Sequence, residues 1–184
     1  MRSMLGALGM RHENGMSGAT MDIALDYRLH IGPVRNQARR IVGNAAWAED
    51  IAQDVFLRLL EHRRRGKWEN DTGAFLYRSV TNLALNRLRD RKRRRALIEA
   101  HTASLNGSSE PSDRLLIRQI LGLVGKREAE VAVYYYIEEL EQQEIAALLE
   151  LPRRTVGRRL EAFRRRAEAL LKDKDEGAPC VLNS

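Results

Sequence analysis

The sequence predicts an all-α protein of two small helical domains joined by a flexible linker, the C-terminal one a helix-turn-helix. Ala, Leu, Arg and Glu dominate the 184 residues, which is the composition of a helical protein. Apolar residues recur at helical spacing in two separate stretches, without strand-like alternation. Between these stretches lies a segment rich in Ser, Gly, Asn and Pro, which is typical of a linker.

The charge balance favours a polyanionic partner. The chain holds 32 Lys and Arg beside 25 Asp and Glu, with a net charge of +7 and a sequence pI near 10.0. This balance is typical of proteins that bind nucleic acid, although a solvated cationic surface alone would give the same values.

Other classes of protein fit the composition less well. The single Cys180 and four scattered histidines predict no disulfide framework, no metal site and no cofactor. No apolar run approaches the roughly 20 residues that cross a bilayer, so we expect a cytoplasmic protein without membrane insertion. Residues 1–20 hold too short an apolar core for a signal peptide, and we expect a disordered leader there.

The N-terminal domain is expected to span residues 21–99 and to hold three helices. The first, at about 27–42, repeats apolar residues from Ile31 to Ile41 and ends at Gly43. The second, at about 45–62, has a stripe through Ile51, Val55 and Leu59. A loop without periodicity precedes the third helix, at about 73–99.

The linker is placed at residues 100–114, around "ASLNGSSEPSD", and a charged tail at 173–184. The intervening domain, 115–172, ends in a short helix at 142–149 and a longer one at 155–171. Pro152 forbids a continuous helix between them, so the chain must turn there. Two helices joined by such a turn predict a helix-turn-helix.

Arginine gathers on the second helix of this motif. Val156, Leu160 and Phe163 form its core stripe, whereas Arg158 and Arg165 share the opposite face. Arginine pairs bidentately with guanine in the major groove and also binds phosphates, which indicates a DNA-reading helix. The alternative is a helical hairpin with a solvated arginine face, in which the clustered arginines would repel one another.

The third helix of the first domain combines aromatic and amide side chains before the basic run "RLRDRKRRR". Unpaired bases stack on aromatic rings and are read by amides, while basic residues hold phosphates. Core packing is the alternative for Phe75 and Tyr77, and a frayed cationic helix end is the alternative for residues 91–95. The carboxylates on the acidic face of the second helix could suggest acid/base catalysis, but no nucleophile, set of metal ligands or enclosing pocket accompanies them. The face is therefore a docking face or a merely solvated one.

Three motifs in order resemble those of bacterial RNA polymerase sigma factors of the extracytoplasmic-function type, within the sigma-70 family. They are "AEDIAQDVFLRLLEH", "GAFLYRSVTNLALNRLRDRKRRR" and "EIAALLELPRRTVGRRLEAFRRRAEALL", and the resemblance covers roughly residues 27–171. It implies that the first domain is region 2-like and the second region 4-like.

The resemblance also implies three sets of binding residues. Those implied for core polymerase are Asp50, Gln53, Asp54 and Leu57. Those implied for the melted −10 element are Trp68, Asn70, Tyr77, Arg78, Thr81, Asn82, Asn86 and Arg87, with "WENDTG" forming a pocket for an extruded base. Those implied for the −35 element are Arg153, Arg154, Thr155, Gly157, Arg158, Glu161 and Arg165.

Some positions depart from the family pattern. Glu150 stands at a turn position that is usually glycine, Pro152 replaces a capping serine, and Gly157 replaces a basic residue. Together with Glu161 at an expected base-reading position, they leave the −35 sequence open.

The expected function is to bind core RNA polymerase, direct it to a restricted set of promoters and assist melting. The protein would not itself be an enzyme and would need no cofactor or small-molecule substrate. Its partners would be core polymerase and promoter DNA, with an anti-sigma protein as an optional third. A stand-alone helix-turn-helix regulator is the alternative, although it would not need the first two motifs. A degenerate member acting only in protein interactions is a third possibility, which the dense arginine disfavours.

Overall fold

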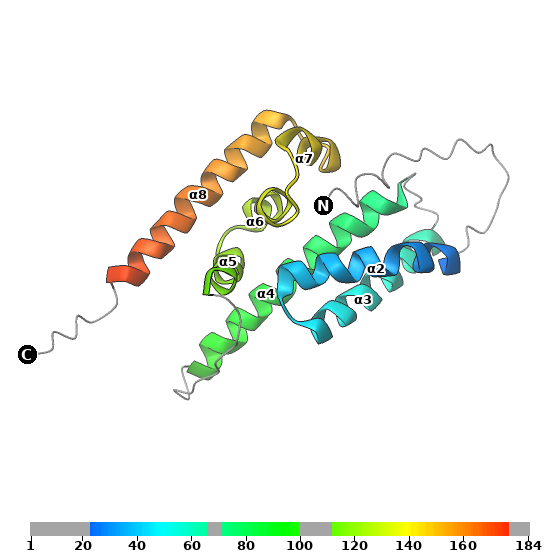
Figure 1. The fold of residues 1–184 in the computed structure, drawn as a ribbon, viewed down its shortest axis with the longest axis horizontal. Coiled ribbons are helices and arrows are strands. Elements are labelled where there is room, and N and C mark those ends of the chain that lie inside the picture. Colours follow the sequence, from blue (N-terminus) through cyan, green and yellow to red (C-terminus); the bar gives the residue numbers. More distant parts are fainter. Residues whose placement is uncertain (1–22, 66–70, 100–111, 177–184) are drawn as a thin grey trace, which may run out of the picture. The chain divides into compact units, whose positions relative to one another are not determined.

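The structure, a computed structural model, describes residues 23–65, 71–99 and 112–176 (Figure 1). Within these residues it is helical and shows no strand, which confirms the all-α class. The first three helices are α2 (Ile23–Val42), α3 (Ala45–Arg64) and α4 (Thr72–Glu99). Then come α5 (Ser112–Leu123), α6 (Lys126–Ala132), a π-helical segment (Val133–Ile137), α7 (Gln142–Leu148) and α8 (Arg153–Glu176).

Contacts between residues divide the chain into two units, and the boundary lies inside α4. The first unit ends at Ala84 and the second begins at Leu85. Within the second unit, α5 passes close to the backbone of α4, because a Cβ on Gly122 would lie 3.5 Å from the carbonyl oxygen of Leu88. The predicted linker, residues 100–114, lies mostly outside the described residues, and α5 already begins at Ser112 within it. The predicted domain limits therefore stay predictions.

In the first unit a tight turn joins α2 to α3. Gly43 ends α2 in the left-handed region, with φ of 70°. Asn44 caps α3, since its side-chain oxygen accepts a 2.9 Å hydrogen bond from the backbone N–H of Trp47. At the far ends of the two helices, Arg63 forms an ion pair with Asp26.

The core of the first unit follows the predicted stripes. Val34, Ala38 and Ile41 of α2 are fully buried, and so is Val55 of α3. The face of α4 in this unit contributes Leu76, Tyr77, Val80, Thr81 and Ala84, all at most 4% exposed.

In the second unit, α7 and α8 form the predicted helix-turn-helix. Glu150 lies in the left-handed region, with φ of 52°. Its N–H bonds to Ala147 O at 3.3 Å and that of Leu151 bonds to Ala146 O at 2.9 Å, which is the pattern of a Schellman turn. Glycine adopts this conformation most readily, which agrees with the expectation of glycine at this turn position. Pro152 then precedes α8 and accepts from the N–H of Thr155 at 2.8 Å through its carbonyl oxygen.

The π-helical segment was not predicted from the sequence. Its wider turn is seen in the 3.0 Å bond from the N–H of Glu138 to Val133 O, five residues back. It places Tyr134 in the core and leaves Tyr136 43% exposed. Helix α8 also differs from its prediction, since it continues to Glu176, into the expected tail.

Candidate nucleic-acid and protein interfaces

Helix α8 presents a polar face opposite its core stripe. Val156, Leu160 and Phe163 are buried, as predicted. Along the other face, exposed side chains recur at intervals of four, three and four residues: Arg154, Arg158, Glu161 and Arg165. Of the remaining residues predicted for the −35 element, Arg153 is exposed, while Thr155 and Gly157 are half-buried. The structure thus brings the predicted set together along one helix.

A shallow hollow flanks this face where α6 meets α8. Its α8 lining includes Arg158, Glu161 and Arg165, and α6 contributes Arg127 and Glu128. Arg127 is exposed, so the hollow carries cations from two elements, as a surface that follows a phosphate backbone requires. Sequence reasoning missed Arg127, although "GKRE" at the start of a short helix was a visible signal.

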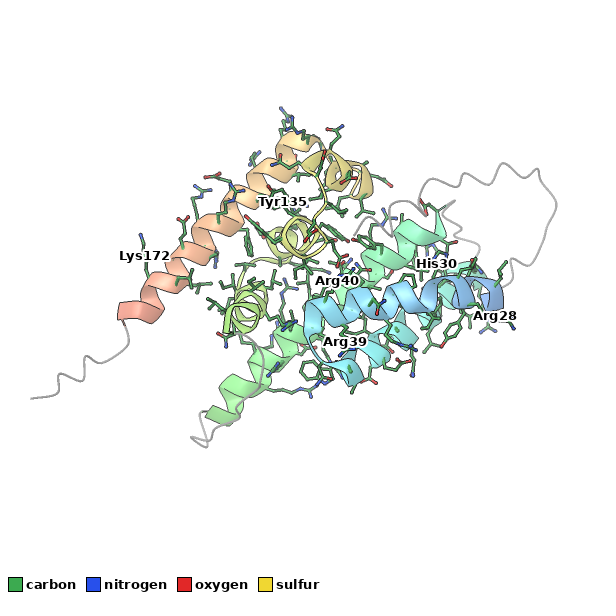
Figure 2. All side chains as sticks on the ribbon, viewed as in Figure 1. Arg28, His30, Arg39, Arg40, Tyr135 and Lys172 are labelled. Carbon is green, nitrogen blue, oxygen red and sulfur yellow. The ribbon has the colours of Figure 1, made fainter. Side chains whose placement is uncertain are left out.

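Two tyrosines of the π-helical segment lie near α8. Tyr135, which Figure 2 labels, lines a second shallow hollow. Arg153 and the start of α7 complete the lining of that hollow. Tyr136 packs edge-on against Tyr135 and accepts a 2.9 Å hydrogen bond from Nε of Arg164. That hydrogen bond is the main reason why the pKa of Arg164 is raised above its ordinary value.

Gly157 is not required by space. A Cβ at this position would meet nothing nearer than the side-chain oxygen of Gln142, at 3.7 Å, an ordinary contact. A larger side chain therefore fits here, and the glycine leaves the adjacent part of the polar face uncovered.

Helix α4 carries a second row of polar side chains. Arg78, Asn82 and Asn86 follow one another at intervals of four residues, so they lie along one side of the helix. Asn86 is exposed and the other two are half-buried, so the row reaches solvent. Arg87, also half-buried, lies away from this row, and the arginines and lysine at 91–94 are exposed.

Burial separates two predicted residues from this row. Tyr77 is 4% exposed and Thr81 is 0% exposed, and the hydroxyl of Thr81 faces Gln37 of α2. In this structure both side chains therefore belong to the packing of α4 and are not on its solvent-facing polar row. Trp68 and Asn70 lie outside the described residues.

Helix α3 exposes the face expected to bind polymerase. Asp50, Gln53 and Asp54 are exposed on it, while Ile51, Val55 and Leu59 are buried on the opposite side. Leu57 belongs to the same exposed face, with 59% of its surface accessible. A single exposed leucine is normal at a protein surface, so the docking role of this face stays a prediction.

Basic residues also mark the last turn of α2. Arg39 and Arg40 are exposed at the end of the helix that leads to α3 (Figure 2). Cations near a helix C-terminus are stabilised by the helix dipole, which is sufficient to explain them.

Within the described residues, no three His, Cys, Asp or Glu side chains are grouped as metal ligands. Nor does any helix described by the structure have the length and apolarity needed to cross a membrane.

Comparisons with known proteins find three similarities. The sigma factor RpoE of Bartonella quintana, solved in complex with the anti-sigma factor NepR, aligns with a TM-score of 0.48 and 18% sequence identity. That alignment covers 82% of this chain and 97% of the other. The ECF RNA polymerase sigma factor SigW of Bacillus subtilis is 28% identical over 151 residues, which cover 73% of this chain and 80% of SigW. Residues 27–94, which contain α3 and most of α4, match the family of sigma-70 region 2. Residues 27–94 thus form a region 2 domain of the sigma-70 family, and over most of its length the chain is similar to a sigma factor of the extracytoplasmic-function type.

Proposed function

We propose that this protein binds core RNA polymerase, directs it to a specific set of promoters and helps to open the duplex there. The observation that carries the proposal is the presence of two different exposed surfaces in one chain. Helix α3 offers carboxylates and an amide around Leu57, whereas α8 offers a row of arginines. The similarity to SigW supports it, because that relative is described as an RNA polymerase sigma factor.

The α3 face is the proposed docking surface for polymerase. Asp50, Gln53, Asp54 and Leu57 are all exposed, and none contributes to the buried stripe. Burying Leu57 against a partner would provide the apolar part of the contact, while the carboxylates favour a basic partner surface.

The α8 face is the proposed reader of the −35 element. Arg158 and Glu161 lie in the first half of the helix, where recognition helices reach base edges. Arginine suits guanine, and glutamate accepts a hydrogen bond from cytosine N4. Arg165 lies further along the helix, where phosphates are nearer.

The polar row of α4 is the proposed contact with the melted −10 element. Asn82 and Asn86 can donate and accept hydrogen bonds at the edges of unpaired bases, and Arg78 can bind a phosphate. These contacts exist only with separated strands, so they stabilise the opened state relative to the duplex.

The protein does no covalent chemistry in this proposal, since polymerase makes the RNA. It acts in the cytoplasm, where polymerase and promoter DNA meet. An anti-sigma protein is a further expected partner, on the basis of the family alone.

Reconstitution tests the proposed function. Purified protein is added to core polymerase from the same host, and the promoters bound by the complex are sequenced. We expect the protein to co-purify with core and to yield specific transcripts from those promoters. A stand-alone regulator would instead select duplex sites without polymerase, and the presence of core would not change its selection.

A further inference from the structure

The contact between α2 and α4 contains a buried amide in apolar surroundings. Gln37 is 0% exposed, and so are Val34, Ala38 and Ile41 on the same helix. Among the described residues of the first unit, Gln37 and Thr81 are the polar or charged side chains that are buried. An amide at such a position must find hydrogen-bond partners or lose several kcal/mol, on the order of 2–7, on leaving water.

Gln37 finds its partners on one turn of α4. Its Nε2 donates to Thr81 Oγ1 at 3.0 Å and to the backbone oxygen of Tyr77 at 3.2 Å. The hydroxyl of Thr81 donates to that same oxygen at 3.2 Å. Both amide hydrogens are therefore directed at groups four residues apart, which lie one above the other on the helix.

We propose that Gln37 is a positioning residue, which fixes the rotation and register of α4 so that Asn82 and Arg78 face outward for the opened promoter strand. The inference rests on the proposed function of the α4 row. Asn82 and Arg78 directly follow Thr81 and Tyr77, so the bonds that hold the inner pair also set the direction of the outer pair.

Apolar packing alone specifies this orientation weakly. Small and branched residues such as Val80 and Ala84 allow one helix to slide or turn against another at little cost. A single buried polar group removes that freedom, because any other register leaves its donors without acceptors. Buried amides fix helix register in coiled coils in the same way.

The amide is not explained by stability. Its Oε1 is buried and makes no hydrogen bond within the described part of the chain. A buried acceptor in this state destabilises the fold, and an apolar side chain of the same length would avoid the loss. The chain thus keeps at this position a group that costs stability and specifies orientation.

The test separates orientation from stability with matched variants in the reconstituted holoenzyme. The double variant Gln37→Met/Thr81→Val replaces both partners by apolar side chains of similar shape, so no donor is left unsatisfied. We expect its unfolding midpoint to equal or exceed that of the wild type, and its affinity for core polymerase to be unchanged. Thr81→Ser retains the hydroxyl and should behave as wild type in every assay.

Promoter opening is the readout that a merely structural role would not change. The probe is a promoter selected by the wild-type holoenzyme, and opening is followed by permanganate reactivity of unpaired thymines. Displacing a functional group by about 1 Å can cost on the order of 100-fold in rate. We therefore expect opening by the double variant to be slower by about tenfold or more.

The controls distinguish the failure of this inference from that of the proposed function. If the stable double variant opens the promoter at the wild-type rate while Asn82→Ala is impaired, Gln37 does not position α4 and the inference is overturned. If Asn82→Ala is itself unimpaired, the α4 row does not contact the opened strand, and the inference fails together with the proposed role of that row. Instability of the double variant would also contradict it, because the amide would then be a stabilising group.

Discussion

Nε of Arg164 donates a 2.9 Å hydrogen bond to the hydroxyl of Tyr136, which ties α8 to the π-helical segment. The bond raises the pKa of Arg164, so the guanidinium is charged at every pH at which DNA binding is measured. Because the pKa of Arg164 is higher in the folded than in the unfolded state, its charged form stabilises the fold. This contribution is complete below the pKa of the unfolded state and is lost only as the pH rises through the pKa of the folded state. Both values lie in the strongly alkaline range.

We therefore expect this pair to give no pH dependence to DNA affinity between about pH 6 and 9. Tyr136→Phe removes the acceptor but keeps the ring and the arginine's charge, so its pH profile should run parallel to that of the wild type. Its slope of affinity against salt should also be unchanged, whereas Arg164→Ala should reduce the slope by about one phosphate contact. Titrations of promoter DNA at several pH values and salt concentrations measure both. A profile that bends in the variant alone would show another titrating group at this site.

Glu150→Gly should stabilise the second unit. Glu150 occupies the left-handed region at φ of 52°, which costs a residue with a side chain about 1 kcal/mol relative to glycine. We expect the free energy of unfolding to rise by about that amount in denaturant titrations. Glu168→Gly, on exposed helical backbone in α8, is the matched control and should lower the free energy by a similar amount. Loss of stability in both variants would contradict the prediction. It would mean that interactions of the Glu150 side chain stabilise the fold by more than the backbone strain at this position costs.

Leu57→Ala should weaken binding to core polymerase without unfolding the first unit. The leucine is 59% exposed and makes little contribution to the core. Leu29→Ala on α2 removes an equally exposed leucine, 59% accessible, outside the proposed docking face. Competition for core between each variant and the labelled wild type measures the effect. Equal losses for the two leucines would extend the docking surface to α2, and no loss for Leu57→Ala would remove α3 from it.

Adding Asp54→Lys to Leu57→Ala should weaken the binding further.

Changes on α8 should separate base reading from phosphate binding. Arg158→Ala and Glu161→Ala should each relax base preference at one position of the −35 element, at about 1–3 kcal/mol for a lost base contact. Arg165→Ala should weaken binding to all DNA sequences alike. It should also reduce the slope of log affinity against log salt concentration by about one phosphate contact. Promoter selection from a randomised library, repeated at two salt concentrations, distinguishes them. A shift in base preference with Arg165→Ala alone would require a different docking of the helix.

Much of the fold follows from periodicity. The ends of α3 and α4 lie within two residues of the positions that the apolar spacing and the Gly43-Asn44 pair predict. The exposed faces of α3 and α8 also followed from spacing, because on an isolated amphipathic helix the polar side is the one left to solvent. Their roles in binding remain predictions.

The inner and outer sides of α4 were harder to predict. Thr81 is polar and was expected at a DNA surface, yet it is buried because Gln37 of α2 supplies its partner. Such a pairing spans 44 positions of the sequence and leaves no local pattern. Arg127 was missed for a related reason, since its place beside α8 depends on how α6 packs against that helix.

The π-helical segment sets the direction of everything that follows it in the second unit. The turn that closes between Glu138 and Val133 holds one residue more than an α-helical turn. The extra residue changes the angle at which the following residues leave the axis of α6. Removing one residue from Val133–Ile137 would tighten the turn to ordinary α-helical spacing and rotate everything downstream by about 100° relative to α6. Because α8 packs against α6, the same deletion would turn the buried stripe of α8 away from α6, so the extra residue is what aligns the proposed DNA-reading helix with its support.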